Sequence, residues 1–126
     1  MSERYPFDYV TVRIVPRIQR GEFINVGVIV YCQAMDYLDA AVEVDQDRLR
    51  ALDPGADADE LTAAAKAYVT PCSATAEDPA APLSPGERFR WLAAPRSTVV
   101  QPGVVHPGLT ADPAGELAYL LDTLVR

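Results

Sequence analysis

The chain has few of the residues that bind metal ions or form disulfides. Its 126 residues include two cysteines, Cys32 and Cys72, and a single histidine, His106. A structural zinc site takes about four cysteine, histidine or carboxylate ligands at short spacings, whereas the two cysteines stand far apart in the sequence. We therefore expect no metal site, no cofactor, and two reduced thiols in place of a disulfide.

A long apolar run is also missing. The longest one, Val26–Cys32, is much shorter than the roughly 20 residues that cross a bilayer as a helix. The first residues, Met1–Pro6, do not combine a positively charged start with an apolar run, as a signal peptide does. The sequence thus predicts a cytoplasmic protein with no membrane segment.

Positive charge is scarce as well. The chain has 11 Lys and Arg against 18 Asp and Glu, a net charge of −7 and a sequence pI of about 4.5. Non-specific affinity for nucleic acid comes mainly from Lys and Arg that neutralise phosphates. The composition therefore disfavours nucleic acid as a partner and favours a basic or neutral one. Hydrophobic residues make up 49% of the chain, which predicts one folded domain over residues 1–126.

Motifs of common enzyme classes are absent. The Pro-Gly pairs at 102–103 and 107–108 lack the glycine pattern and the lysine of a phosphate-binding P-loop. His106 needs a nucleophile or an orienting carboxylate to act as a general base. No spacing ties Ser97, Thr98 or Glu22 to it. The favoured interpretation is a structural or surface histidine, with a functional one as the alternative, and an enzyme is the weaker prediction for the chain.

What the chain has in plenty is alternation of apolar and polar residues. The pattern has period two in Phe7–Arg17, Phe23–Cys32 and Tyr37–Val44, which is typical of half-buried strands. The links between these segments are too short for a parallel crossover, so they predict hairpins. We predict an α+β fold in which residues 7–44 form an antiparallel β-meander. Its even-numbered apolar residues share one face, and the helices pack on that face.

The middle of the chain predicts two short helices within residues 45–70. They are Asp45–Leu52 and Asp57–Tyr68, each opened by a capping aspartate. Residues 73–83 are rich in Ala, Pro and acidic residues without a period, which predicts a flexible loop.

Residues 84–126 predict a helix, an extended segment and a C-terminal helix. Ser84 to Glu87 has the spacing of a capping box with a proline in the first turn, and Pro95 ends that helix by Ala94. Ser97–Gln101 reads as extended, and a loop carrying His106 follows. Asp112 then opens a helix whose leucines recur at helical spacing.

The odd-numbered face of the meander predicts a small binding depression. If the hairpins close symmetrically, Arg13 falls opposite Gly27. Gly27 and Ala41 then form a shallow floor, which is bordered by Arg13, Asn25, Glu43 and Asp39. The alternative is structural: Gly27 allows another backbone to pack closely, and Arg13 forms a surface ion pair worth about 0–1 kcal/mol.

A local basic cluster surrounds the single tryptophan. Arg88 and Trp91 lie three residues apart on the predicted helix, and Arg96 follows it. Arginine and tryptophan are enriched at interaction hot spots, so one interpretation is a surface that binds an anion or a partner. The other makes Trp91 a core residue and the arginines a solvated rim.

Several phrases of the chain resemble a bacterial family called domain of unknown function 3037. They are Tyr9–Arg17, Gly21–Ile29 and Phe89–Pro102, and the resemblance runs from about Phe7 to Val125. It implies no established reaction and no catalytic residues. It also implies a neighbouring gene for a HipA-like kinase, and therefore a shared pathway or complex.

Two functional hypotheses follow. The first is a non-catalytic accessory protein that binds the HipA-like kinase encoded nearby. The second is a small-ligand-binding domain or a small enzyme that uses the face of Arg13, Asn25 and Glu43, together with Arg96 and His106. A deep pocket around those side chains favours the second, and an open surface beside Trp91 favours the first.

Overall fold

The alternating front of the chain folds into the strands of one antiparallel sheet. A computed structural model describes residues 3–73 and 82–126. In chain order its elements are β1 (Tyr5–Ile14), the 3-10 helix η1 (Ile18–Arg20), β2 (Ile24–Cys32), β3 (Tyr37–Val42), α1 (Gln46–Leu52), α2 (Ala58–Tyr68), the 3-10 helix η2 (Thr70–Ser73), α3 (Pro85–Ala93), β4 (Val100–Pro102), β5 (His106–Thr110) and α4 (Pro113–Leu124).

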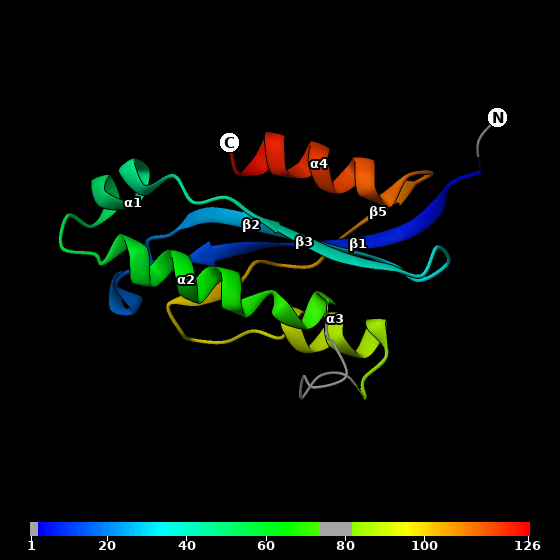
Figure 1. Cartoon of the computed structure of the whole chain (residues 1–126), viewed down its shortest axis with the longest axis horizontal. Coiled ribbons are helices and arrows are strands. Elements are labelled where there is room, and N and C mark those ends of the chain that lie inside the picture. Colours follow the sequence, from blue (N-terminus) through cyan, green and yellow to red (C-terminus); the bar gives the residue numbers. More distant parts are fainter. Residues whose placement is uncertain (1–2, 74–81) are drawn as a thin grey trace.

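The predicted meander is confirmed. β1 pairs with β2 and β2 with β3, all antiparallel, and the strand order is β3-β2-β1-β4. β5 also pairs with β1, further along the edge that β4 occupies. The result is a single α+β domain with a five-stranded sheet at its centre (Figure 1).

A β-bulge in β2 changes which side chains share a face. The register shifts from Val12 opposite Gly27 to Arg13 opposite Asn25, so Val26 is the extra residue. Ile24 and Val26 pack in one core, whereas Val28 and the residues alternating with it toward the end of the strand pack in another. The prediction that the even-numbered residues of this strand share one face is therefore wrong, because a bulge reverses the parity.

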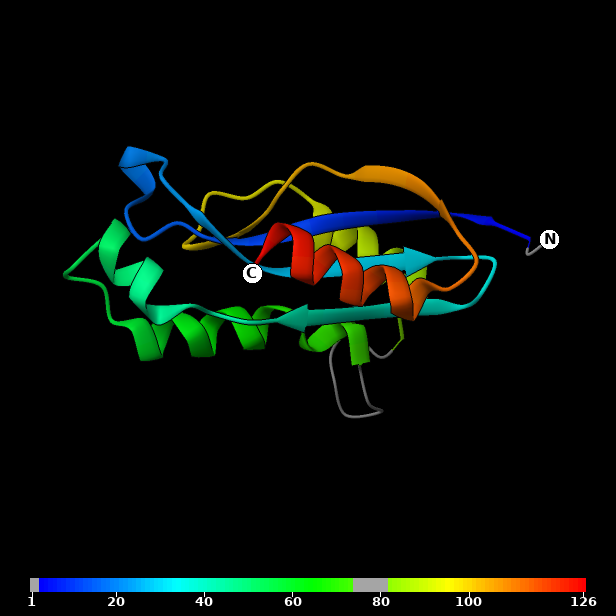
Figure 2. The same ribbon diagram turned by 90° about the horizontal axis from the view of Figure 1, so that it is seen from above.

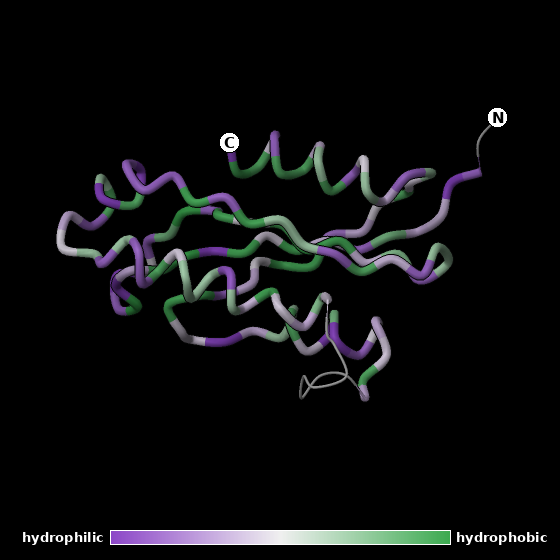
Figure 3. Tube along the Cα trace, in the orientation of Figure 1, coloured by the Kyte–Doolittle hydropathy of each residue, from purple (hydrophilic) through white to green (hydrophobic). Residues whose placement is uncertain are grey.

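Helices cover both faces of the sheet, whereas the sequence predicted one. α2 and α3 lie on one side and α4 on the other (Figure 1). The first core joins the sheet to the helices through Leu49, Ala65 and Phe89. The second joins it to α4 through Leu117 and Leu120. Hydrophobic segments accordingly run along the strands between the two helical layers (Figure 3). Burying one such leucine contributes roughly 1.5–3 kcal/mol, so each layer is held by several of these contacts.

The predicted helix starts are confirmed by their caps. The side chains of Asp45, Asp57 and Asp112 each accept a hydrogen bond from a backbone N–H in the first turn. Ser84 and Glu87 form the complete capping box, with a proline in the first turn. Each cap contributes on the order of 1 kcal/mol.

The segment carrying His106 is a strand, not the loop that its Pro-Gly pairs predicted. β5 pairs with β1 so that Gly108 lies opposite Phe7. A Cβ at Gly108 would lie 2.5 Å from the Phe7 ring, so the glycine lets the aromatic ring lie over the strand. Proline is tolerated here because β5 is at the edge of the sheet.

Some expectations concern membranes, metals and the predicted flexible loop. Within the described residues, no helix has the length and apolar character needed to cross a membrane. The same residues contain no group of three or more His, Cys, Asp or Glu side chains arranged to hold a metal ion. Residues 74–81 of the predicted loop lie outside the described part of the chain.

Both cysteines are free and buried. The prediction that Cys32 and Cys72 form no disulfide is therefore confirmed. Burial raises the pKa of the Cys72 thiol to about 12. At pH 8 about one Cys72 thiol in ten thousand is then ionised, against roughly a quarter for a free cysteine. The thiolate is the reactive form, so this thiol is protected by both burial and protonation.

We predict that the folded protein reacts with a disulfide reagent such as Ellman's reagent at least about a hundredfold more slowly than the urea-unfolded protein. Both thiols should become titratable on unfolding, with release of the chromophore as the readout. A rapid reaction of either thiol in the folded state would contradict the buried positions of the cysteines.

Candidate functional site

The residues of the predicted depression do not form it. Arg13 lies opposite Asn25, whereas Gly27 pairs with Val12 and Val42 on the other face of the sheet. The cause is a register one residue away from the symmetric closure, because a one-residue shift moves every side chain to the opposite face. Gly27 instead has the structural role considered as its alternative. A Cβ there would lie 2.7 Å from the carbonyl oxygen of Ala41.

Asn25 and Glu43 hold the C-terminal turn of α4. The Asn25 side-chain amide donates to the Leu124 carbonyl over 3.3 Å. Glu43 accepts a hydrogen bond from Arg126 Nε at 2.5 Å. The last carbonyls of a helix lack partners within the helix. Asn25 supplies a partner to one of these carbonyls, and Glu43 anchors Arg126, which follows the helix. Both side chains of the predicted site are therefore occupied with attaching α4.

Arg13 remains as a polar group without a charged partner. Its guanidinium lies 4.1 Å from the centre of the Phe23 ring, which is cation–π geometry. No ion pair among the described residues includes it. Its Nε and the Asn25 Oδ1 are buried without hydrogen-bond partners. Leaving such a group unpaired costs roughly 1–3 kcal/mol, so the unpaired Nε of Arg13 lowers the free energy of unfolding.

The arginine–tryptophan cluster is partly assembled. Trp91 is 54% exposed, so it is a surface residue and not part of the core. The Arg96 guanidinium lies 4.7 Å from the Trp91 ring centre and 5.0 Å from that of Tyr68. It also donates to the Trp91 carbonyl. Trp91, Arg96 and Tyr68 thus form one cluster, which we call the α3 surface.

Arg88 lies away from the α3 surface. Its Nη1 donates to the Pro71 carbonyl at 3.0 Å, so it fastens α3 to η2. Its Nε is buried and unpartnered. The helical spacing predicted that Arg88 and Trp91 share one side, but Arg88 is directed to η2, and the third member of the cluster is Tyr68 from α2, which the sequence did not indicate.

A shallow groove runs along the other flank of α3. It has a volume of about 310 Å³, and its lining includes Phe89, Arg90 and Ala94 from the helix end and Val105 from the sheet edge. Val104 and Leu109 are also exposed along this edge, at 70% and 60%. Like Arg13, Arg90 takes part in none of the ion pairs within the described chain.

His106 belongs to an aromatic stack and not to a catalytic arrangement. Its ring lies 5.2 Å from that of Tyr9, nearly parallel. Of the candidate partners, Glu22 bonds Arg20 at 2.5 Å, and the Thr98 hydroxyl donates to the Val100 carbonyl. The structure therefore supports the surface interpretation of this histidine.

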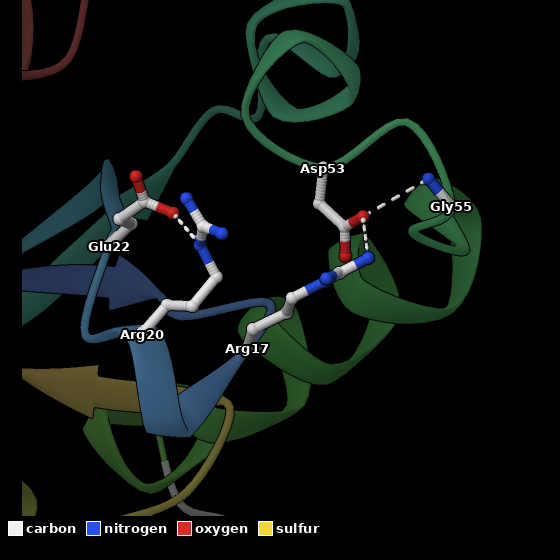
Figure 4. A network of polar contacts seen from close by, with 5 residues as sticks. All are labelled: Arg17, Arg20, Glu22, Asp53 and Gly55. Carbon is white, nitrogen blue, oxygen red and sulfur yellow. Dashed lines mark hydrogen bonds and ion pairs between the residues drawn. The ribbon is translucent and has the colours of Figure 1, made fainter.

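A polar network at the opposite end of the sheet was missed by the sequence analysis (Figure 4). Asp53 is 9% exposed; it accepts the Gly55 N–H at 3.1 Å and faces Arg17 Nη2 at 3.5 Å. Nearby, the Arg20 guanidinium lowers the pKa of Glu22 through their hydrogen bond. Arg17, Arg20, Glu22 and Asp53 line a depression of about 190 Å³.

Both arginines of this network face carboxylates, so the depression has little charge left for an anion. The network instead ties the first hairpin to the connection between α1 and α2. The Asp53–Gly55 turn was recognisable from its residues, but Arg17 lies 36 positions away from Asp53 in the chain.

Comparison with known proteins gave one family match. A family model described as "Protein of unknown function (DUF3037)" matches residues 9–125. No curated protein matches the chain, and no solved structure matches it.

The structural role of Gly27 yields a prediction about stability. Gly27→Ala should lower the free energy of unfolding by about 1–3 kcal/mol, because the new Cβ meets the Ala41 carbonyl in a packed sheet. Gly55→Ala is the matched control, since its Cβ would have no neighbour closer than 3.6 Å. Urea unfolding followed by circular dichroism measures both. Equal stability of the two variants would show that Gly27 is not at a close approach of backbones.

Proposed function

Because the chain belongs to the DUF3037 family, whose description assigns no function, we propose its role from its own surface: it is a non-catalytic accessory protein that binds another protein through the α3 surface. The partner we propose is a HipA-like kinase encoded by a neighbouring gene, which is what the resemblance to the family implies. In this role the protein is bacterial and cytoplasmic and acts by association.

The observation that supports this proposal is the exposed and pre-arranged Trp91. Its exposed fraction is 54%, and Arg96 contacts its ring and carbonyl. Tryptophan and arginine are the residues most enriched at binding hot spots. A side chain held in place before binding loses little conformational entropy when a partner arrives. The α3 surface therefore has the composition and the order of a binding anchor.

Charge supports an acidic segment as the group that docks there. Arg96 and Arg90 make no ion pair among the described residues, although acidic residues outnumber basic ones by 18 to 11 in the whole chain. An Arg stacked on aromatic rings still presents the edge of its guanidinium to a carboxylate. We propose that a segment of the kinase bearing Asp or Glu contacts Arg96 while an apolar residue packs on Trp91.

The alternative role as a ligand-binding domain or small enzyme has weaker support. Glu43 is paired with Arg126, Asn25 holds α4, and Gly27 lies on the opposite face from Arg13. Of the residues in that hypothesis, Arg13 is partly exposed and has no ion pair within the described chain, whereas Arg96 belongs to the α3 surface.

Binding of the tagged kinase to purified variants tests the proposal. Trp91→Ala should weaken the affinity, raising the dissociation constant by about thirtyfold or more, which corresponds to about 2 kcal/mol at a hot spot. Arg96→Ala should weaken it by about tenfold. Because Trp91 is exposed, its loss should lower Tm by no more than about 5 °C. Calorimetric titration and thermal melts measure these effects.

Two control variants separate binding from folding. Tyr119→Ala removes another exposed aromatic ring, 63% exposed, from α4 on the other side of the sheet, and should leave affinity unchanged. Phe89→Ala removes a buried ring of the same helix and should cost about 3–5 kcal/mol of stability. If the kinase does not bind the wild-type chain, the proposed partner is wrong. Wild-type affinity of Trp91→Ala sinks the α3 surface.

A further inference from the structure

One strip of the sheet is left without a helix on the side of α4. α4 packs chiefly on β2 and β3, and in Figure 2 part of β1 (blue) is uncovered between α4 (red) and the β4–β5 segment (orange). Alternation along β1 places Tyr9, Thr11 and Arg13 on this side, and all three are partly exposed. We call this strip the β1 shelf.

The Thr11 hydroxyl and the Arg13 guanidinium converge above Gly103. The Gly103 N–H donates to the Thr11 carbonyl, which brings the glycine directly beside β1. A Cβ at Gly103 would lie 2.4 Å from Thr11 Oγ1 and 3.1 Å from Arg13 Nη2. Two hydrogen-bond donors therefore lean over the same spot, and any residue larger than glycine would push them apart.

Aromatic rings border this pair of donors. Phe23, which is 43% exposed, lies under the guanidinium at 4.1 Å. The stacked rings of Tyr9 and His106 stand one step along the strand pair. Stacking on Phe23 fixes the plane of the guanidinium, so that its N–H groups point along that plane.

No carboxylate of the described chain neutralises Arg13. Four other arginines of the described chain, Arg17, Arg20, Arg50 and Arg126, each pair with an acidic side chain. In a chain with net charge −7, a half-buried arginine without such a partner is matched most simply by an external anion.

We propose that the β1 shelf is a binding subsite for the carboxylate of a small molecule that carries an aromatic or flat apolar group. The carboxylate accepts hydrogen bonds from Arg13 and Thr11, and the flat group lies against Phe23 or the Tyr9–His106 stack. This site lies on the opposite face of the sheet from the α3 surface, so it goes beyond the proposed accessory role and is independent of it.

A carboxylate fits this site better than a phosphate. Arg13 supplies a single positive charge to the β1 shelf. The arginines of the described chain that form ion pairs are not part of this shelf. One guanidinium balances a monoanion and pairs with it through two parallel hydrogen bonds. A phosphate dianion would keep an unbalanced charge beside an acidic protein.

Titration of the full chain with benzoate, followed by ¹H–¹⁵N NMR, tests the inference. Benzoate should shift the signals of the Gly103 amide and the Arg13 Nε–H with a saturable curve. Arg13→Gln should weaken that binding by at least about tenfold, because it removes a charge-assisted hydrogen bond. Thr11→Val, which keeps the shape of the side chain, should weaken it by about threefold to tenfold. Inorganic phosphate should bind at least about tenfold more weakly than benzoate.

Arg50→Gln is the charge-matched control, since Arg50 is exposed on α1, and it should bind benzoate like the wild type. Dispersed spectra and melting temperatures establish that each variant is folded; if Arg13→Gln is not, Thr11→Val decides. Shifts that do not saturate, shifts that spread over all the surface arginines, or equal binding by the folded variants would overturn the proposal. Tighter binding of phosphate than of benzoate would also overturn it.

Discussion

The β-bulge at Val26 is the constraint on which both cores depend. A regular strand places alternate residues on alternate faces, so a strand rich in Val and Ile throughout cannot keep its apolar residues to one face. By inserting one residue, the bulge assigns Ile24 and Val26 to the core under α2 and α3, and Val28 to the core under α4. Every residue from Val26 to Val30 is thereby buried. The sheet has to be covered on both sides because its central strand is apolar on both sides.

The same bulge determines where the polar residues of the sheet lie. It places Asn25 opposite Arg13, next to the last turn of α4, whose carbonyls are taken by Asn25 and by Arg48 from α1. The end of α4 is thus held by side chains from two other elements. Arg13 does not share this contact: its Nε–H donates no hydrogen bond, and no ion pair among the described residues includes its guanidinium.

Features that depend on neighbouring residues could be predicted from the sequence. The caps at Asp45 and Ser84 need only a side chain and the backbone N–H three residues on, and the strands need only alternation. The register could not be predicted, because the bulge lies inside β2 and leaves no turn residue to mark it. An error of one residue in the predicted register placed Gly27 and Arg13 on the same face, whereas they lie on opposite faces of the sheet.

Contacts between distant residues were also beyond reach. Trp91 and Arg96 are close in sequence, but Tyr68, which completes their cluster, comes from another helix. The buried Asp53 was recognisable as a turn residue, yet its contact with Arg17 depends on how the first hairpin meets the helical segment. The strand β5 was read as a loop because its pairing with β1 spans most of the chain.

The position of α4 in the chain has a consequence for biosynthesis. All five strands precede α4 in the sequence, and chains emerge from the ribosome with the N-terminal part first. The sheet and the helices of its first face can therefore assemble while Val28, Val30 and Phe7 still wait for the helix that buries them. During that interval the nascent chain displays an apolar sheet face of the kind that chaperones recognise and that promotes aggregation. Once α4 has emerged, the hydrogen bonds that Asn25 and Arg48 donate to its C-terminal end hold the helix over this face.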